Sequence, residues 1–261
     1  MHRALWVGKT GLEAQDISLS TISNNLANVS TTGFKKDRAV FQDLIYQIQR
    51  QPGAQENQDS QLPSGLQLGT GVRTVGTQKI FSQGDLQITD NPLDLAINGR
   101  GFFQIVLPDG TIAYTRDGTF TQNADGEIVN NSGYLLEPAI QLPEQTSTVT
   151  IGSDGTVSVV SAGDNLPQEI GTIEIVDFIN PTGLQAIGNN LFLETGSSGE
   201  PQIGVPSEEG FGKMVQGALE SSNVKIVEEM VDMIATQRAY EMNSKVVSTA
   251  DQMLGFITSN L

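Results

Sequence analysis

Apolar residues recur at a fixed interval near the N-terminus. Leucine occupies every seventh position from residue 5 to residue 26, and a second apolar row lies three positions further on, at residues 22 and 29. This spacing is typical of a helix that presents one apolar seam to a partner helix. Thr31-Thr32-Gly33 is a stop signal because glycine adopts the left-handed cap conformation at little cost. The expected N-terminal seam consists of Leu5, Leu12, Leu19, Ile22, Leu26 and Val29.

The C-terminal end repeats this pattern over a longer stretch that contains no proline. The interval of seven residues predicts a helix from about Val224 to Thr258, with Ser222 or Asn223 as its cap. Such a helix would be roughly 50 Å long at about 1.5 Å per residue. A rod of this length with one apolar seam cannot bury that seam against itself. The expected C-terminal seam consists of Ile226, Met233, Tyr240, Val247, Leu254 and Leu261.

The two seams share one period although they lie at opposite ends of the chain. Either helix taken alone could simply pack its apolar face on an ordinary core. The matching period favours a coiled or bundled pair instead. Gly8 and Gly11 weaken the first turns of the N-terminal helix, so this helix needs its partner for stability.

The middle of the chain has a different character. Residues 47–71 are polar and rich in glutamine, which predicts a linker or an extended arm that becomes ordered against a neighbour. From about residue 72 to residue 205, turn signals follow one another closely, and short strands such as 102–106 and 172–176 lie between them. The turn signals are Pro108-Asp109-Gly110, Arg116-Asp117-Gly118, Ala124-Asp125-Gly126, Asn131-Ser132-Gly133 and Ser153-Asp154-Gly155.

These patterns predict an α+β fold in which long N- and C-terminal helices form a coiled-coil-like pair and the middle domain is antiparallel all-β. Residues 1–46 hold the N-terminal helix of the helical domain, and residues 211–261 hold the C-terminal helix that pairs with it. Residues 47–71 form the polar, extended arm, and residues 72–210 form the β domain.

Charge is distributed unevenly along the 261 residues. The chain carries 30 acidic and 14 basic residues, a formal net charge of −16, which argues against nucleic acid as a partner. Residues 40–210 hold 21 of the acidic and 5 of the basic residues, so the two ends together are neutral. The ends can therefore approach each other without net repulsion, and the middle domain is the more solvated part.

Catalytic and ligand-binding signals are weak. The single histidine, His2, allows neither a Ser-His-Asp triad nor a histidine metal site. A calcium-loop likeness around Asn123 and Asp125 fails because Ser132 stands where the bidentate carboxylate belongs. Glycine pairs at 69 and 71 and at 99 and 101 lack the third glycine of a dinucleotide site. No feature singles out a carboxylate pair for glycoside hydrolysis. We expect no enzyme activity and no catalytic, cofactor-binding or metal site.

The first ten residues do not form a secretory signal, because they contain no apolar core and no small-residue cleavage site. No apolar run approaches the length that spans a membrane. With no cysteine, the chain needs no disulfide, and its redox compartment stays open. The expected product is cytosolic, or it leaves the cell by a route that cleaves nothing.

Three separated motifs resemble the bacterial flagellar rod and hook protein family. Ser23–Lys35 is similar to the N-terminal signature, Gly101–Gln104 with the two turns that follow is similar to the β domain, and Glu220–Lys245 is similar to the C-terminal signature. Residues 51–55 and 62–72 look like the insert of the distal-rod members, which hook proteins lack. The motif residues that we expect to matter for function are Asn24, Asn25, Asn28, Gly33, Phe34, Gln237, Arg238 and Asn243.

This resemblance implies a subunit of the basal-body distal rod, exported without a cleaved signal peptide by the flagellar type III apparatus and polymerised in the periplasm. Its implied partners are other copies of itself, the proximal rod proteins, the hook or hook-rod junction, and the surrounding bushing ring. It implies no nucleic acid, no small-molecule substrate, no cofactor and no embedding in the membrane. The polymer would be a rigid hollow shaft that transmits torque from motor to hook and encloses the export channel.

Several points stay open at this stage. Asn24, Asn25 and Asn28 could line the channel or bridge subunits through amide hydrogen bonds, or they could simply be exposed. A proximal rod or hook relative of the same family is one alternative function. A secreted carbohydrate-binding or adhesive β module, oligomerised by its terminal helices, is an alternative from another class.

Overall fold

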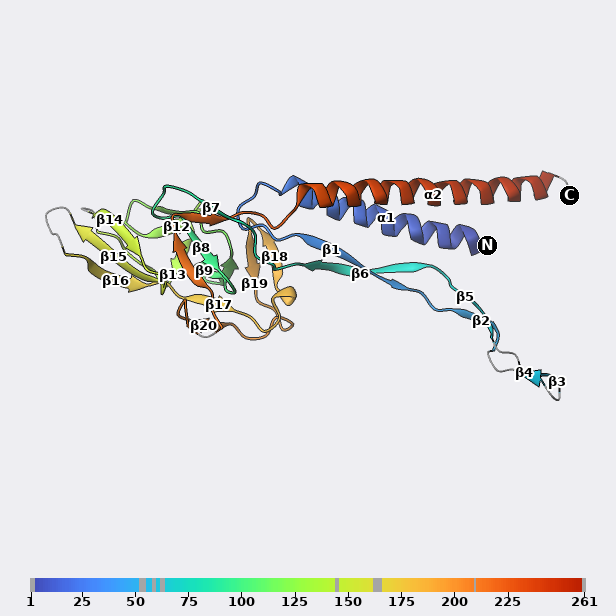
Figure 1. Ribbon diagram of the computed structural model, residues 1–261, viewed down its shortest axis with the longest axis horizontal. Helices are drawn as coiled ribbons and strands as arrows, with labels where there is room; N and C mark the ends of the chain where they lie inside the picture. Colours follow the sequence, from blue (N-terminus) through green and yellow to red (C-terminus); the bar gives the residue numbers. More distant parts are fainter. Residues whose placement is uncertain are drawn as a thin grey trace. The chain divides into compact units, whose positions relative to one another are not determined.

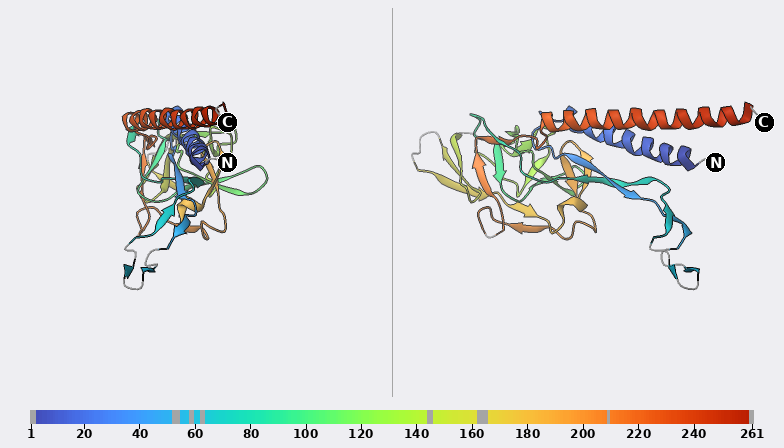
Figure 2. Two further views of the ribbon diagram at one scale, coloured as in Figure 1. Left: turned by 90° about the vertical axis from the view of Figure 1, so that its right-hand side faces the viewer. Right: turned by 45° about the vertical axis from the view of Figure 1, so that its right-hand side comes forward.

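The computed structural model describes residues 3–51, 55–57, 60–61, 64–143, 146–161, 166–208 and 210–259. The chain forms two compact units (Figures 1 and 2). Unit 1 comprises Met1–Leu26, Asp37–Gln78 and Lys225–Leu261, and unit 2 comprises Ala27–Lys36 and Lys79–Val224. The predicted α+β class, the two terminal helices and the antiparallel character of the middle are confirmed.

Unit 1 consists of two helices and a long strand ribbon. Helix α1 spans Arg3–Ala27 and helix α2 spans Ile226–Ser259, close to the predicted C-terminal helix. Glu228 and Glu229 occupy the first turn of α2. In the ribbon, β1 (Asp37–Asp43) pairs with β6 (Val72–Lys79), β2 (Gln47–Arg50) pairs antiparallel with β5 (Leu66–Leu68), and β3 (Gln55–Asn57) pairs antiparallel with β4 (Ser60–Gln61).

Helix α1 ends at Ala27, six residues before the glycine that was expected to stop it. A turn follows, in which the Thr31 amide and hydroxyl donate to the backbone oxygen and the side-chain oxygen of Asn28. Gly33 does adopt the left-handed conformation, with φ of 68°. Close packing also requires glycine here, because a Cβ would lie 2.7 Å from the Asp117 backbone nitrogen. Residues 27–36 therefore group with the β unit and not with the helix that precedes them.

The strands of unit 2 all pair antiparallel. The largest sheet has the order β11-β12-β13-β9-β10-β19-β18, and a second sheet has the order β14-β15-β16. Three strand pairs, β17 with β20, β21 with β8, and β22 with β7, complete the unit. The bounds are β7 Leu86–Ile88, β8 Leu95–Asn98, β9 Phe103–Val106, β10 Ile112–Thr115, β11 Phe120–Gln122, β12 Ile128–Asn130, β13 Leu135–Glu137, β14 Thr146–Ile151, β15 Thr156–Ser161, β16 Gln168–Thr172, β17 Ile175–Asp177, β18 Gln185–Gly188, β19 Leu191–Leu193, β20 Gln202–Gly204, β21 Lys213–Gln216 and β22 Ala218–Glu220, with a 3-10 turn at Pro181–Gly183.

Four of the five predicted turns are hairpin turns, and their glycines have positive φ, at Gly110, Gly126, Gly133 and Gly155. The fifth, at Arg116-Asp117-Gly118, joins β10 to β11 without forming a hairpin. Gly118 is required there for close approach, since a Cβ would lie 1.6 Å from the Leu95 carbonyl oxygen. The predicted strand at 102–106 is confirmed as β9, whereas residues 172–176 straddle the break between β16 and β17.

Two apolar clusters fill unit 2, and the adjacent residues Phe102 and Phe103 each belong to a different cluster. Phe103 belongs to the larger cluster, which gathers around Leu95, Ile105 and Val157. Phe102 belongs to an aromatic cluster with Tyr114, Val176, Phe178, Leu184 and Phe192. Successive side chains of extended backbone point to opposite sides, so this pair ties together the cores on either side. Phe102 meets Phe178 edge-on, with ring centroids 6.0 Å apart.

Candidate functional site

The two helices of unit 1 run antiparallel and touch at small residues (Figure 1). A Cβ placed on Gly8 would lie 2.7 Å from Val247 Cγ2, and one on Gly11 would lie 3.0 Å from Asn243 Nδ2. Further along, Asn25 on α1 reaches Glu229 on α2. The glycines that weaken α1 in isolation are therefore positions at which α2 approaches closely.

Asn25 is the best-defined polar residue of this contact. Only 2% of its surface is exposed. Its Nδ2 donates to the Asp37 carbonyl at 2.9 Å and to Glu229 Oε2 at 3.1 Å, while its Oδ1 accepts from the Asp37 amide at 2.9 Å. One side chain thus joins α1, α2 and the start of β1. Asn25 is therefore not simply exposed, and its amide forms hydrogen bonds within the subunit.

On α2 the buried positions follow a seven-residue interval that differs from the predicted row. Glu229, Thr236 and Ala250 are buried and Asn243 is half-buried. Met233, Val247 and Leu254 of the predicted row are half-buried beside them, whereas Ile226 and Tyr240 are exposed. Leu261 lies outside the described residues. The side of α2 that faces α1 is therefore partly polar.

The predicted N-terminal row is only half-buried. Leu5, Leu12, Leu19, Ile22, Leu26 and Val29 all keep an intermediate exposure, and Val29 lies beyond the end of α1. Leu5 and Leu12 lie three residues before and four residues after Gly8, so their side chains lie beside the point where α2 approaches Gly8. These leucines border the helix contact instead of filling it.

A second face of α1 contacts the strand ribbon. Thr10 is 8% exposed, and its Oγ1 accepts a hydrogen bond from the Val72 amide at 3.4 Å. A Cβ on Gly71 would lie 2.3 Å from the same oxygen, and Gly71 has φ of 118°. Glycine is required at this position by both the contact and the backbone conformation. Helix α1 is thus held on two sides, by α2 and by the ribbon.

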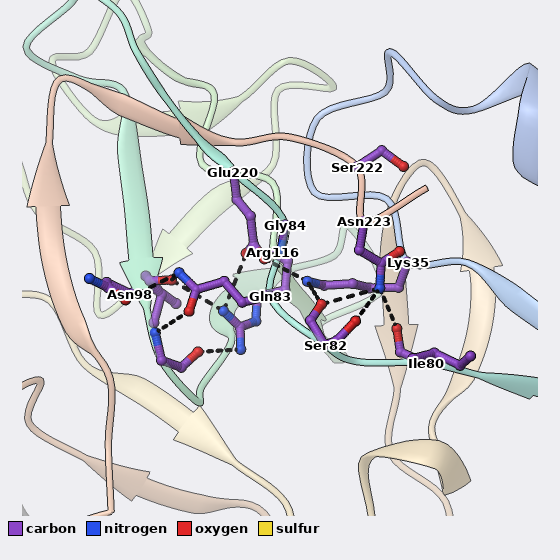
Figure 3. A network of polar contacts seen from close by, with 12 residues as sticks. Lys35, Ile80, Ser82, Gln83, Gly84, Asn98, Arg116, Glu220, Ser222 and Asn223 are labelled. Atoms are coloured by element: carbon purple, nitrogen blue, oxygen red, sulfur yellow. Dashed lines mark hydrogen bonds and ion pairs between the residues drawn. The ribbon is translucent and has the colours of Figure 1, made fainter. Parts of the chain in front are cut away.

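Lys35, Arg116 and Glu220 form a buried charge network within unit 2 (Figure 3). The side chains of Lys35 and Glu220 are fully buried, and Lys35 Nζ lies 2.6 Å from Glu220 Oε1. Arg116, whose side chain is 5% exposed, places NH1 3.3 Å from the other carboxylate oxygen, Oε2. Glu220 Oε1 also accepts from the Gly84 amide at 2.9 Å. One carboxylate therefore balances two buried cations.

Burial lowers the pKa of Lys35 below the ordinary lysine value, and the carboxylate of Glu220 opposes this shift. Burial lowers the pKa of Arg116 in the same way, again opposed by Glu220. Backbone carbonyls assist this carboxylate, since Lys35 donates to the Ser82 carbonyl at 2.8 Å and Arg116 NH2 donates to the Gly99 carbonyl at 2.7 Å. Phe102 packs against the guanidinium, with its ring centroid 5.3 Å from the Arg116 Cζ. Glu220 is the carboxylate that both cations share.

Asn223 links three of the four places where the chain enters or leaves unit 2. Its Oδ1 accepts from the Lys36 amide at 2.8 Å, and its Nδ2 donates to the Ile80 carbonyl at 2.7 Å and the Ser82 carbonyl at 3.2 Å. The chain leaves the unit after Lys36 and after Val224, and returns to it at Lys79. These crossings are bound into one cluster, which Lys35 extends by donating to the Ser82 carbonyl at 2.8 Å.

Comparison with known proteins places these features in a family. Three family descriptions match the chain: "Flagella basal body rod protein" over residues 5–35, "Flagellar hook protein FlgE/F/G D1 domain" over 96–159, and "Flagellar basal body rod FlgEFG protein C-terminal" over 215–261. The flagellar basal-body rod protein FlgG of Buchnera aphidicola subsp. Schizaphis graminum is 55% identical over 97% of this chain and 98% of its own length. The chain belongs to the flagellar basal-body rod protein family.

Members of the rod family with lower sequence identity also support this assignment. FlgG of Borreliella burgdorferi is 51% identical over 100% of this chain and 99% of its own length. FlgG of Bacillus subtilis is 38% identical over 97% of each chain. The resemblance noted in the sequence is therefore confirmed, and the matches run along the entire chain.

The motif residues of the rod family occupy distinct environments. Asn24 is exposed, Asn28 accepts from Thr31, and Gly33 packs on the backbone at 116–117. Phe34 is half-buried, and Lys79 Nζ lies 5.4 Å from its ring centroid. Gln237 and Arg238 are exposed on α2, and Asn243 faces Gly11. Part of the signature therefore builds the fold and part remains on the surface.

Sequence reasoning missed the network of Lys35, Arg116, Glu220 and Asn223. Lys35 and Glu220 stand 185 residues apart, and each was noted only as one letter of a separate motif. Their pairing has no local pattern, because it depends on how residues 27–36 dock into the β unit. Among the residues that the structure describes, no group of three or more His, Cys, Asp or Glu side chains could hold a metal ion. No described helix is long and apolar enough to cross a membrane.

Proposed function

We propose that this chain is a structural subunit of the distal rod of the flagellar basal body and that it polymerises through its terminal helices. The observation that carries this proposal is the surface of α2. Large apolar side chains such as Val227, Met242 and Phe256 are 74%, 68% and 72% exposed. Exposed apolar patches of this kind mark interaction sites. Neighbouring copies are the partner that a rod subunit meets most often.

In this proposal the helices of unit 1 form a coiled-coil-like pair that builds the inner part of a rigid hollow shaft, and unit 2 forms its wall. The shaft transmits torque from motor to hook and encloses the export channel. Its further contacts are with the proximal rod, the hook or hook-rod junction, and the bushing ring. The subunit reaches the periplasm without a cleaved signal peptide and has no catalytic role. The antiparallel contacts from Gly8 to Asn25 on α1 support the pairing of the helices.

The purified chain is expected to polymerise at high concentration into straight tubes. Electron microscopy would distinguish the proposed rod subunit from a hook relative, because a hook must bend and its polymers curve. Curved tubes would indicate that the chain is a hook relative and not a subunit of the distal rod. A monodisperse monomer that instead gave saturable signals on a glycan array would contradict the proposal and favour an adhesive β module.

The arm at residues 47–71 is proposed to contact an adjacent subunit and to stiffen the shaft. Its described part exposes Ile48 by 56% and Leu66 by 49%, and Ile45 just before it by 84%. Residues 52–54, 58–59 and 62–63 of the arm lie outside the described residues.

Deleting residues 47–71 is expected to leave a soluble, folded monomer whose polymers bend. The deletion removes β2 to β5 and no part of the two helices. The persistence length of polymers in electron micrographs would measure the effect, with circular dichroism of the monomer as the control for folding. Straight and rigid polymers of the deleted chain would show that the arm does not stiffen the shaft.

A further inference from the structure

Eight exposed apolar residues of α2 form two stripes, while Ile226 and Tyr240, which are 48% and 41% exposed, belong to the row that borders α1. The proximal stripe consists of Val227, Met230, Val231 and Ile234, which are 74%, 50%, 60% and 50% exposed. The distal stripe consists of Met242, Val246, Met253 and Phe256, which are 68%, 50%, 55% and 72% exposed. Residues 235–241 separate the two stripes along the helix.

The stripes lie on opposite flanks of the row that borders α1. Val227 and Ile234 each follow a member of the row 226, 233, 240, 247 and 254 by one residue. Val246 and Met253 each precede a member of that row by one residue. At about 100° per residue, the proximal stripe therefore points to one side of the α1 contact and the distal stripe to the other.

The two stripes also match in spacing. Val227 and Val246 are 19 residues apart, and so are Ile234 and Met253. Two parallel copies of α2 displaced by 19 residues, or about 28 Å at about 1.5 Å per residue, would therefore bring both pairs level at once. An antiparallel two-fold arrangement would instead bring Val227 level with Met253 and Ile234 level with Val246, but it closes after two copies and cannot extend a rod.

A groove beside the distal stripe offers a binding site for a neighbouring helix. It has a volume of about 380 Å³ and is lined by Met242, Val246 and Met253 of α2 together with Ala4 of α1. Ala4 is small, so α1 leaves this space open. Charge favours a second copy meeting along the helices, because residues 40–210 carry 21 acidic and 5 basic residues, whereas α1 carries two of each and α2 carries five acidic and two basic residues. Two copies therefore repel less along these helices than along residues 40–210.

We propose that the proximal stripe of one copy packs against the distal stripe and groove of the next copy, with the two α2 helices parallel and displaced by about 28 Å. This inference rests on the proposed function and names the surface through which self-assembly proceeds. The contact is heterologous, since different residues meet from the two sides. A heterologous contact that does not close on itself generates an open filament.

Single cysteines test this register cleanly, because the natural chain contains none. Full-length Ile234→Cys and Met253→Cys chains are mixed, polymerised, examined by electron microscopy and then mildly oxidised. We expect a disulfide-linked dimer from the mixture and at most one tenth of that yield from either variant alone. Val227→Cys mixed with Val246→Cys is expected to behave in the same way.

Two matched mixtures control for proximity that is not specific. Val227→Cys with Met253→Cys is out of register by seven residues, and Ile234→Cys with Ser248→Cys places the second thiol on the flank opposite the distal stripe. Both are expected to give at most one tenth of the in-register yield. Polymers that cross-link within a single variant, or equally in all mixtures, would overturn the proposed contact while leaving the proposed function intact. A chain that forms no polymer would overturn both.

Discussion

Replacing Glu220 by glutamine is expected to lower the free energy of unfolding of unit 2 by about 3–5 kcal/mol, because removal of one partner leaves buried charge uncompensated. Glu220 is the carboxylate that contacts both Lys35 and Arg116, and its side chain is fully buried. Urea titration followed by far-ultraviolet circular dichroism would measure the loss. Trp6, the single tryptophan, lies on α1 and reports on unit 1 in the same experiment.

The control for this substitution is Glu169→Gln, which removes the same charge from an exposed position on β16. A surface change of this kind is expected to alter stability by no more than about 0.5 kcal/mol. Adding Lys35→Met to Glu220→Gln should recover part of the loss, since one of the two uncompensated cations is then gone. Equal stabilities of Glu220→Gln and Glu169→Gln would show that the buried network does not stabilise unit 2.

Replacing Gly8 by leucine is expected to destabilise unit 1 by about 1–3 kcal/mol, the range for overpacking a close contact, and to reduce polymer yield at least tenfold. Even the first carbon of the new side chain would meet Val247 at 2.7 Å. The helices must then separate, which displaces both surfaces proposed to meet neighbouring copies. Urea titration of Trp6 fluorescence and sedimentation of polymers would measure the two effects.

Gly255→Leu provides the matched control, because a Cβ at Gly255 has no described atom within 4 Å although it also lies in a terminal helix. It is expected to assemble as the natural chain does. Combining Gly8→Leu with Val247→Ala should restore part of the stability by opening space opposite the new side chain. If Gly8→Leu polymerised normally, the close contact of α1 with α2 would have no role in assembly.

The sequence allowed the elements to be predicted more readily than their contacts. The seven-residue interval located both helices, and the glycine turns at 110, 126, 133 and 155 located four hairpins, because these signals act within a few residues. The interval did not reveal that α1 meets α2 partly through Gly8, Gly11 and Asn25. Periodicity reports where a helix is apolar, whereas close approach selects residues that are small.

The candidate assembly surface was predictable only in part. The leucine row of α1 and the row at 233, 247 and 254 are half-buried, as their apolar character predicts. The most exposed apolar residues of α2 lie outside that row. Residues such as Val227 and Met242 fall outside the strict interval of seven. The interval of seven residues marks only the positions that face one partner helix, so it does not mark Val227 or Met242.

The docking of residues 27–36 into the β unit has a consequence for the order in which the molecule can fold. The Gly33 amide donates to the Glu220 carbonyl at 2.7 Å, and Lys35 requires the carboxylate of the same residue. A polypeptide that emerges from a narrow passage with its N-terminus first must therefore release nearly its whole length before unit 2 can close. Contacts that distant in sequence form slowly. Late folding of unit 2 would keep the emerging chain unfolded, and therefore narrow, until nearly all of it has left the passage.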